Sequence, residues 1–411
     1  MDISLAYGKA TRIVTIPDGV EVDTFISRGI DTIIDRATFL ERFAASGGER
    51  LLDAPFPLMI VNDGYRHTPT ARILAWLNSA YPERLDRADF LIATGTHPAP
   101  TEPQYRGIFG DLYDQLKSRI LVHDCRDLES MEVVGRDRFG GEVYLNKAVL
   151  EHDNVLIIGS VEPHYFAGFT GGRKSLFPGV SDLATTERNH NLANSLDARP
   201  MRLRGNPVAQ HFEELMTFVE TREFYTVQIV MDADHNIREV CCGSLNDAFA
   251  RACEVAARMY GCTADDTYDV VLCEMRPPLD KNLYQLQKGL ENCRSAVHAG
   301  GAAIVVSACE EGVGSEHFFN QALTWDRHKN RPKDGILRFG SHKLSRVNAM
   351  TRRIDVLLHS ELPHHSVKQV FYEPIDDITH YLAERRASHD LDRLAVVYDA
   401  GHTVVTVNKD N

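Results

Sequence analysis

Short apolar runs alternate along the chain with longer segments whose apolar positions repeat with a helical period. The runs predict buried strands at residues 57–62, 89–94, 155–159, 269–273, 302–307 and 355–359. The longer segments predict helices at residues 69–78, 102–116, 181–196 and 283–297. Because strands alternating with helices are typical of α/β proteins with mainly parallel sheets, we expect that fold class.

A stretch of low hydrophobicity at residues 262–268 divides the chain. It predicts an N-terminal α/β domain over residues 1–261 and a C-terminal α/β domain over residues 268–392. Two further apolar runs near the end of the chain predict a tail hairpin over residues 393–411, which can return to the first domain.

Composition narrows the choice of partner and compartment. Asp and Glu outnumber Lys and Arg by 58 to 45, and the formal net charge of -13 argues against nucleic acid as a main partner. The longest apolar stretch, residues 302–308, is too short to span a membrane, and the chain starts without the apolar core of a secretory signal. The 8 cysteines form no CxxC pair and indicate reduced thiols. We therefore expect a cytoplasmic protein that binds neither nucleic acid nor membranes.

Polar residues directly follow the first two predicted strands. Asp63 and Arg66 come after the first strand, where a carboxylate and a guanidinium can bind a hydroxyl and an anionic group. The alternative is a turn with a surface ion pair. His97 follows the second strand in a glycine-containing turn, where it can be a general acid or base, or a structural residue.

A glycine-rich segment at residues 162–179 contains His164, Arg173 and Lys174. It nearly matches the phosphate-binding pattern G-x-x-x-x-G-K-[ST], but Arg173 replaces the second glycine, which argues against nucleotide triphosphate hydrolysis. His164 is a candidate acid/base and Lys174 a candidate amine nucleophile, unless the segment is only a charged surface loop. His190, in the helical stretch that follows, is a candidate metal ligand or a structural histidine.

One predicted helix carries three more candidate residues. Tyr284 and Lys288 stand four residues apart with Gln285 beside them, so all three can face one cleft, or else form a solvated face. Histidines elsewhere form no HExxH or H-x-H pair, which argues against a zinc hydrolase.

Four segments, in this order, resemble the lactate racemase family of nickel-pincer enzymes. They are NDGYRHTP from Asn62, ATGTHPAPTE from Ala93, PHYFAGFTGGRKSLFPGV from Pro163 with an Asn-His pair at 189–190, and PLDKNLYQLQKGLEN from Pro278. The sequence departs from the family at Gly64-Tyr65, where Pro-Thr is common, and this changes local contacts to the cofactor or the substrate.

The resemblance implies an isomerase that racemises or epimerises a small 2-hydroxy acid. It implies two α/β domains with the cofactor in a cleft between them. The cofactor would be a nickel-pincer nucleotide, a pyridinium-3,5-bisthiocarboxylic acid mononucleotide with nickel, joined covalently to Lys174. His190 would bind the nickel. The planar arrangement of donors in a pincer cofactor suits Ni(II). Proteins of cofactor biosynthesis would be transient partners.

The remaining site roles come from the same resemblance. His97 and His164 would be the acid/base pair. Asp63 would help to hold the mononucleotide, and Arg66 would contact both the cofactor and the substrate carboxylate. Further contacts to the substrate would come from Tyr284, Gln285 and Lys288.

The chemistry of a 2-hydroxy acid fits this assembly. The carboxylate opposes a carbanion at the neighbouring carbon, so an ordinary histidine cannot remove the α-hydrogen as a proton, whereas a cofactor can accept it as hydride. Two other functions have less support in the sequence. A 2-hydroxy acid dehydrogenase with a dissociable nicotinamide cofactor is disfavoured because no G-x-G-x-x-G follows a strand. A non-catalytic cofactor-binding paralogue is disfavoured because both His97 and His164 are present.

Overall fold

The computed structural model describes residues 1–336, 338 and 340–408. The chain forms two compact units, which we name by their place in the sequence. The central unit contains Gly29–Leu192 and Met201–Ala257, and the terminal unit contains Met1–Arg28, Ala193–Pro200 and Arg258–Asn411. No helix in the described part is both long enough and apolar enough to cross a membrane.

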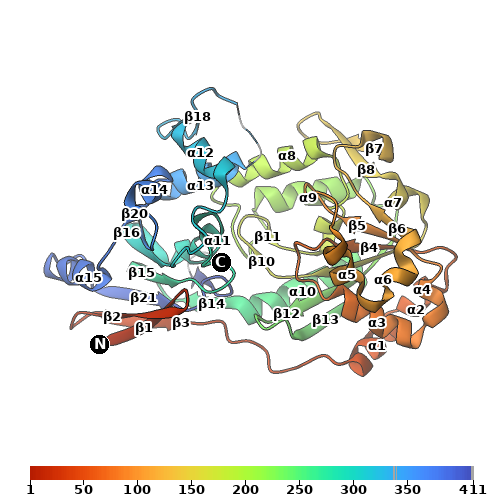
Figure 1. The fold of residues 1–411 in the computed structure, drawn as a ribbon, viewed down its shortest axis with the longest axis horizontal. Helices are drawn as coiled ribbons and strands as arrows, with labels where there is room; N and C mark the ends of the chain where they lie inside the picture. Colours follow the sequence, from red (N-terminus) through yellow and green to blue (C-terminus); the bar gives the residue numbers. More distant parts are fainter. Residues whose placement is uncertain (337, 339, 409–411) are drawn as a thin grey trace. The chain divides into compact units, whose positions relative to one another are not determined.

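A six-stranded sheet forms the centre of the central unit, in the strand order β13-β12-β9-β4-β5-β6 (Figure 1). Its strands are β4 (Leu58–Asn62), β5 (Asp89–Ala93), β6 (Ile120–Val122), β9 (Val155–Ser160), β12 (Phe224–Met231) and β13 (Ile237–Ser244). All neighbours are parallel except β12 and β13. β4 and β9 are buried almost throughout, and this explains their continuous apolar runs, because both faces of a parallel sheet are covered.

The helices of the central unit lie before, between and after the strands of this sheet in the sequence. They are α1 (Arg36–Ala45), α2 (Gly48–Asp53), α3 (Thr70–Ala80), α4 (Pro82–Leu85), α5 (Glu102–Phe109), α6 (Tyr113–Leu116), α7 (Lys147–Glu151), α8 (Leu183–Asn191), α9 (Pro207–Thr217) and the start of α10 (Leu245–Tyr260). Phe39 and Phe43 of α1 share one core with Leu74 of α3 and Phe90 of β5. The helix predicted over 102–116 is interrupted at Gly110, whose φ of 58° is incompatible with a continuous helix.

A second six-stranded sheet, β20-β19-β16-β15-β21-β3, forms the centre of the terminal unit. Its strands are all parallel: β3 (Glu21–Phe25), β15 (Tyr268–Glu274), β16 (Val297–Val306), β19 (Asp355–His359), β20 (Glu373–Pro374) and β21 (Arg393–Val397). The helices of this unit are α11 (Leu283–Cys293), α12 (Glu316–Leu323), α13 (Ser341–Met350), α14 (His364–Gln369) and α15 (Ile378–Ala387).

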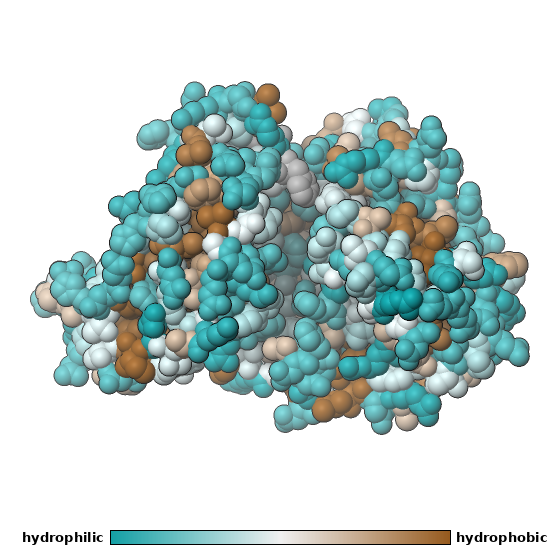
Figure 2. Space-filling view, viewed as in Figure 1, coloured by the Kyte–Doolittle hydropathy of each residue, from teal (hydrophilic) through white to brown (hydrophobic). Residues whose placement is uncertain are grey.

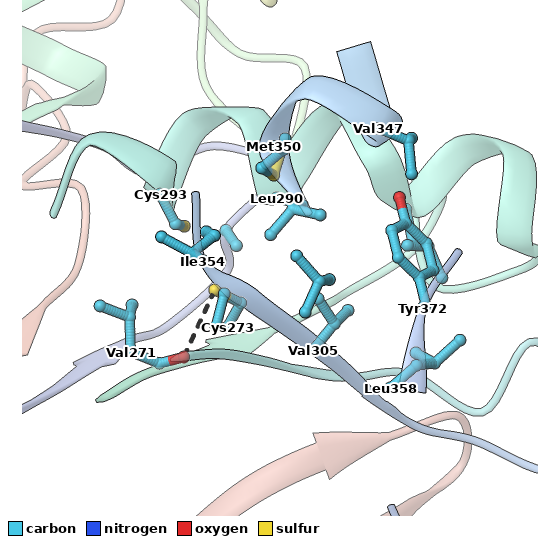
Figure 3. Packing of buried hydrophobic residues seen from close by; sticks show 14 of the residues in the cluster. Val271, Cys273, Leu290, Cys293, Val305, Val347, Met350, Ile354, Leu358 and Tyr372 are labelled. Carbon is cyan, nitrogen blue, oxygen red and sulfur yellow. Dashed lines mark hydrogen bonds between the residues drawn. The ribbon is translucent and has the colours of Figure 1, made fainter. Parts of the chain in front are cut away.

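Different elements pack against the two faces of this sheet. On one face, Val271 and Val305 of the sheet belong to the same apolar core as Leu290 of α11 and Val347 of α13 (Figure 3). On the other face, the hairpin of β1 (Asp2–Tyr7) and β2 (Ala10–Thr15) contributes to a core that also includes side chains of α15. The amino terminus is therefore part of the terminal unit.

Short strand pairs complete the fold. They are β7 (Met131–Arg136) with β8 (Glu142–Asn146), β10 (Pro163–His164) with β11 (Gly168–Phe169), β14 (Gly261–Ala264) with β22 (Val404–Val407), and β17 (Trp325–Asp326) with β18 (Arg331–Pro332). Hydrophilic side chains cover most of the surface seen in Figure 2, and apolar ones form small patches.

The division of the chain differs from the predicted domain boundaries. Residues 1–28 were assigned to the N-terminal domain, but β3 pairs with β21 in the sheet of the terminal unit. The predicted tail hairpin over 393–411 is wrong, because β21 and β22 pair with different partners in different sheets and stay in the terminal unit. Residues 409–411 of that tail lie outside the described part of the chain.

A fully buried ion pair anchors a short segment within the terminal unit. The two carboxylate oxygens of Glu291 accept hydrogen bonds from Arg346 at 2.6 and 2.7 Å, and Arg294 donates to one of them at 2.8 Å. Burial alone would raise the pKa of Glu291, but the two guanidiniums hold it below its usual value. Arg346 also donates to the carbonyl of Ala193 at 2.7 Å, and Arg294 to that of Leu196 at 2.6 Å.

Replacing Arg346 with methionine should lower the free energy of unfolding by about 3–5 kcal/mol, because the carboxylate of Glu291 stays buried with one cation fewer. Urea unfolding at pH 7 measures the loss, with the exposed Arg331→Met as control. Since the native pKa of Glu291 is depressed, its stabilising contribution is present above the unfolded pKa of about 4.3 and is lost as the pH falls through the native pKa. The difference between wild type and R346M should therefore shrink in acid, and a loss below about 1 kcal/mol at pH 7 would contradict this reading.

Candidate active site

Three loops with candidate residues leave the same edge of the central sheet. Strands β4, β5 and β9 are parallel neighbours, so the segments that follow them begin at their carboxyl ends. The candidates on these segments are Asp63, Arg66, His97, His164 and Lys174. The backbone N–H of Gly95 donates to the carbonyl of Gly179 at 2.9 Å and ties the second loop to the third. In open α/β sheets this edge is where ligands bind.

His97 and Asp63 form a hydrogen-bonded pair. Nδ1 of His97 lies 2.6 Å from Oδ2 of Asp63, a carboxylate only 4% exposed, and Oδ1 of Asp63 accepts the backbone N–H of Tyr65 at 3.2 Å. Because a carboxylate accepts, the imidazole donates through Nδ1, and the lone pair of the neutral ring is on Nε2. The ring of Tyr65, at the position where the sequence departs from the family pattern, lies 4.4 Å from that of His97. Asp63 thus orients His97. The predicted contact of Asp63 with a mononucleotide stays a prediction.

His164 has the opposite arrangement of ring nitrogens. It ends β10, and its Nδ1 accepts the backbone N–H groups of Ala167 at 3.2 Å and Phe166 at 3.5 Å. A neutral His164 therefore carries its proton on Nε2. The two predicted acid/base residues are set differently: His97 has a lone pair on Nε2, and His164 has an N–H there.

Lys174 lies on a tight 3-10 turn, and its side-chain amine has a lowered pKa. Burial lowers the pKa of Lys174 well below its usual value, the positive charge of Arg66 lowers it further, and Glu162 opposes this. Its Nζ lies 5.7 Å from the ring centre of Phe166 and 5.8 Å from that of Phe212. A lowered pKa favours the neutral form of the amine, which is the nucleophilic form expected of a residue that forms a covalent bond.

His190 is fixed as a single tautomer on α8. Its Nδ1 donates to the carbonyl of Thr186 at 2.9 Å, so the lone pair of the neutral ring is on Nε2. Burial lowers the pKa of His190 to about 3, and the positive charges of Lys174 and Arg66 act in the same direction against the hydrogen bond to Thr186. A neutral imidazole with an oriented ring is the form that binds a metal ion.

Phe166 connects these candidates, and the sequence analysis did not single it out. Its ring makes edge-on contacts with His164 at 4.5 Å and with His190 at 5.1 Å between ring centres, and Lys174 lies over it. The three candidates therefore surround one aromatic side chain. The signal in the sequence was the pair of aromatic residues beside His164.

Two buried amides also support the site and were not predicted. Oε1 of Gln228, on β12, accepts the backbone N–H of Gly172 at 2.8 Å at the start of the turn that carries Lys174. The side-chain amide of Asn189 lies 3.2 Å from Nδ1 of His211 on α9 and fixes the helix that carries the neighbouring His190. Their positions depend on contacts between elements far apart in the sequence.

Tyr284, Gln285 and Lys288 lie on α11 in the terminal unit. The side chain of Lys343, on α13 and only 2% exposed, donates to the carbonyl of Tyr284 at 2.8 Å and lies 3.7 Å from its ring centre. Burial lowers the pKa of Lys343 well below its usual value, and the charge of Lys288 lowers it further. Lys343 is a buried amine that the sequence did not reveal. A common site of these residues with those of the central unit stays a prediction.

The side chains that could bind a metal ion can be compared with those a metal site needs. Among residues 1–336, 338 and 340–408, no group of three or more His, Cys, Asp or Glu side chains could hold a metal ion. His190, the predicted metal ligand, is therefore not part of such a cluster in the described residues.

Models of known protein families match two parts of the chain. A family model for the lactate racemase N-terminal domain matches residues 7–199, and one for the lactate racemase C-terminal domain matches residues 265–344. The chain belongs to the lactate racemase family. The predicted resemblance is thereby confirmed, and both family domains lie in the order expected from the four sequence segments.

Two proteins named lactate racemase are similar in sequence to this family member. The protein of Thermoanaerobacterium thermosaccharolyticum is 30% identical over 282 residues, and that of Lactiplantibacillus plantarum is 29% identical over 266 residues. These matches span 67% and 64% of this chain, and 64% and 61% of the length of the relatives.

Solved structures show the same fold. The lactate racemase apoprotein from T. thermosaccharolyticum superposes with a TM-score of 0.82 at 24% identity, covering 98% of this chain and 100% of that one. A Thermotoga maritima protein superposes with a TM-score of 0.69 at 15% identity, covering 93% of this chain and 100% of that one. The predicted α/β class with mainly parallel sheets is confirmed.

Proposed function

We propose that this member of the lactate racemase family racemises or epimerises a small 2-hydroxy acid, with a nickel-pincer nucleotide joined covalently to Lys174. The observation that carries the proposal is the arrangement of Lys174 and His190 around Phe166. One is an amine with a lowered pKa, and the other is an imidazole with a lowered pKa and its lone pair on Nε2.

The residues fit such a cofactor. A neutral Lys174 can form an amide-type bond, which an ammonium cannot. Nε2 of His190 carries the lone pair that a planar Ni(II) centre needs from the protein. When bound, the cofactor supplies a carbon that accepts the substrate α-hydrogen as hydride and returns it to either face. Proteins that make and deliver the cofactor would be transient partners.

The protein side of the reaction is proton transfer at the substrate hydroxyl. Nε2 of His97 accepts the hydroxyl proton, and the carboxylate of Asp63 stabilises the imidazolium that forms. Nε2–H of His164 is a hydrogen-bond donor for an oxygen on the other face. Arg66 and Lys288 would bind the substrate carboxylate, and Tyr284 and Gln285 would line the pocket.

The direct test combines mass and stereochemistry. Protein produced together with the cofactor pathway should carry a covalent adduct, and a panel of chiral 2-hydroxy acids and sugar acids should contain one that loses its stereochemical purity. An adduct on Lys174 would exclude a dissociable nicotinamide cofactor, and turnover would exclude a non-catalytic carrier. The proposal fails if the loaded protein changes the configuration of no member of the panel.

Replacing Asp63 with asparagine should lower kcat about 10²-fold or more and leave the adduct on Lys174 intact. The amide can still accept the hydrogen bond from Nδ1 of His97, but it lacks the charge that stabilises the imidazolium. Activity assays and intact mass measure the two effects, and the exposed Asp111→Asn is the control. Loss of the adduct in D63N would instead assign Asp63 to holding the mononucleotide.

A further inference from the structure

A pocket lies in the central unit at the amino-terminal edge of the sheet, whereas His97 and Lys174 follow the carboxyl ends of its strands. It has a volume of about 740 Å³. Asn154 and Phe224, at the starts of β9 and β12, line it, as do residues of α9 and the first turn of α10. We propose that this pocket binds a small zwitterion, with an oxyanion on Arg173 and Arg222 and an ammonium group at an acidic rim.

Arg222 provides a donor that lacks an acceptor. Its guanidinium binds the carbonyl of His152 through Nη2, while its buried Nε has no hydrogen-bond partner within the described chain. Buried polar groups are nearly always hydrogen-bonded, because an unpaired donor loses its hydration without compensation. An oxyanion in the pocket would supply the missing acceptor.

Arg173 adds a second guanidinium to the pocket. Its side chain is 13% exposed and is paired with Glu213 at 3.0 Å, whose own side chain is 54% exposed. A guanidinium has five donors, so this pair leaves further N–H groups for a ligand. Two guanidiniums that line one pocket can bind a phosphate or a carboxylate with charge-assisted hydrogen bonds.

The carboxylates of the pocket lie further out than these two arginines. Three further exposed acidic residues line the pocket, Asp153, Glu220 and Glu223, and they outnumber the one exposed arginine there, Arg50. A simple anion would be attracted by the arginines but repelled by the carboxylates of the rim. A zwitterion would place its anionic group near the arginines and its ammonium group near the carboxylates. The first turn of α10, with its partial positive charge, lines the same pocket and favours the anionic end.

The position of Arg173 links the pocket to the candidate active site. Arg173 and Lys174 are neighbours on one 3-10 turn, yet Arg173 lines the pocket and Lys174 lies over Phe166. An anion bound by Arg173 would therefore be held by the turn that presents the cofactor lysine. This proposal does not depend on the proposed function, because the pocket needs no cofactor.

Isothermal titration at fixed ionic strength tests the pocket with two probes, inorganic phosphate and O-phosphoethanolamine. We expect saturable one-to-one binding of both, with O-phosphoethanolamine tighter. Arg222→Met and Arg173→Met should each weaken binding about tenfold or more, because each removes a charge-assisted contact. The double variant E220Q/E223Q should abolish the preference for O-phosphoethanolamine and leave phosphate binding in place. Arg87→Met, an exposed arginine outside the pocket, is the matched control.

Circular dichroism of each variant shows whether a loss of binding comes from a loss of folding. If R222M does not fold, R173M and the double glutamine variant still decide the outcome, since they leave Arg222 in place. The proposal is overturned if neither probe binds saturably, or if folded R173M binds both probes as the wild type does. Equal affinity for the two probes in the wild type would overturn the acidic rim as a recognition element.

Discussion

Replacing Lys174 with alanine should leave the protein without a covalent cofactor and without measurable racemisation. Burial and the charge of Arg66 lower the pKa of the Lys174 amine and so favour its nucleophilic form, and alanine removes this amine. Lys174→Arg should fail equally, because a guanidinium stays protonated and is not a nucleophile at neutral pH. Intact mass after production with the cofactor pathway and a racemisation assay measure the two losses.

A matched control separates this chemistry from a general effect on the protein. Lys117 is a lysine of the same unit with a side chain that is 61% exposed, and Lys117→Ala should keep both the adduct and the activity. Thermal unfolding should show that K174A and K174R remain folded. Turnover like that of the wild type in either Lys174 variant would show that the loop only binds an anion, as its glycine content first suggests.

Replacing either His97 or His164 with alanine should depress turnover in both directions by about 10²–10⁴-fold, the usual contribution of a general acid or base. Each face of the substrate needs its own group at the hydroxyl, so neither direction can bypass the missing one. The loss should appear in kcat rather than as a small change in KM. His67→Ala is the control, because His67 lies on the same loop as Arg66 and its ring makes a tilted contact with that of His235, at 4.8 Å between ring centres.

Isotope tracing distinguishes hydride transfer from proton abstraction in the same variants and in the wild type. A substrate deuterated at the α-carbon should give a product that keeps its deuterium, because a cofactor with hydride chemistry would prevent exchange of this hydrogen with solvent. Washout of deuterium at the rate of racemisation would falsify the hydride mechanism. His97 and His164 would then be a carbon acid/base pair for a substrate with a more acidic α-hydrogen.

The sequence by itself determined the fold class and the location of most candidate residues. Strands such as Leu58–Asn62 and Val155–Ser160 are continuous apolar runs because they are buried on both faces, and this is a local property of the chain. Since parallel strands end at one edge, residues that follow them meet there whatever the details of the loops. The motif around His164 and Lys174 could also be recognised from the sequence, because it is one continuous segment of the chain.

Only the tertiary structure decided how these residues are paired and charged. The bond between Asp63 and His97 joins loops that follow different strands, and it alone fixes which nitrogen of His97 can accept a proton. The lowered pKa of Lys174 comes from burial and from the nearby Arg66, which is more than one hundred residues earlier in the chain. The half-exposed strand Glu21–Phe25 gave no clear apolar signal, and pairing with β21, far away in the sequence, places it in the terminal unit. Local patterning specifies which segments are buried, whereas desolvation, tautomers and long-range strand pairing arise only when distant segments come together.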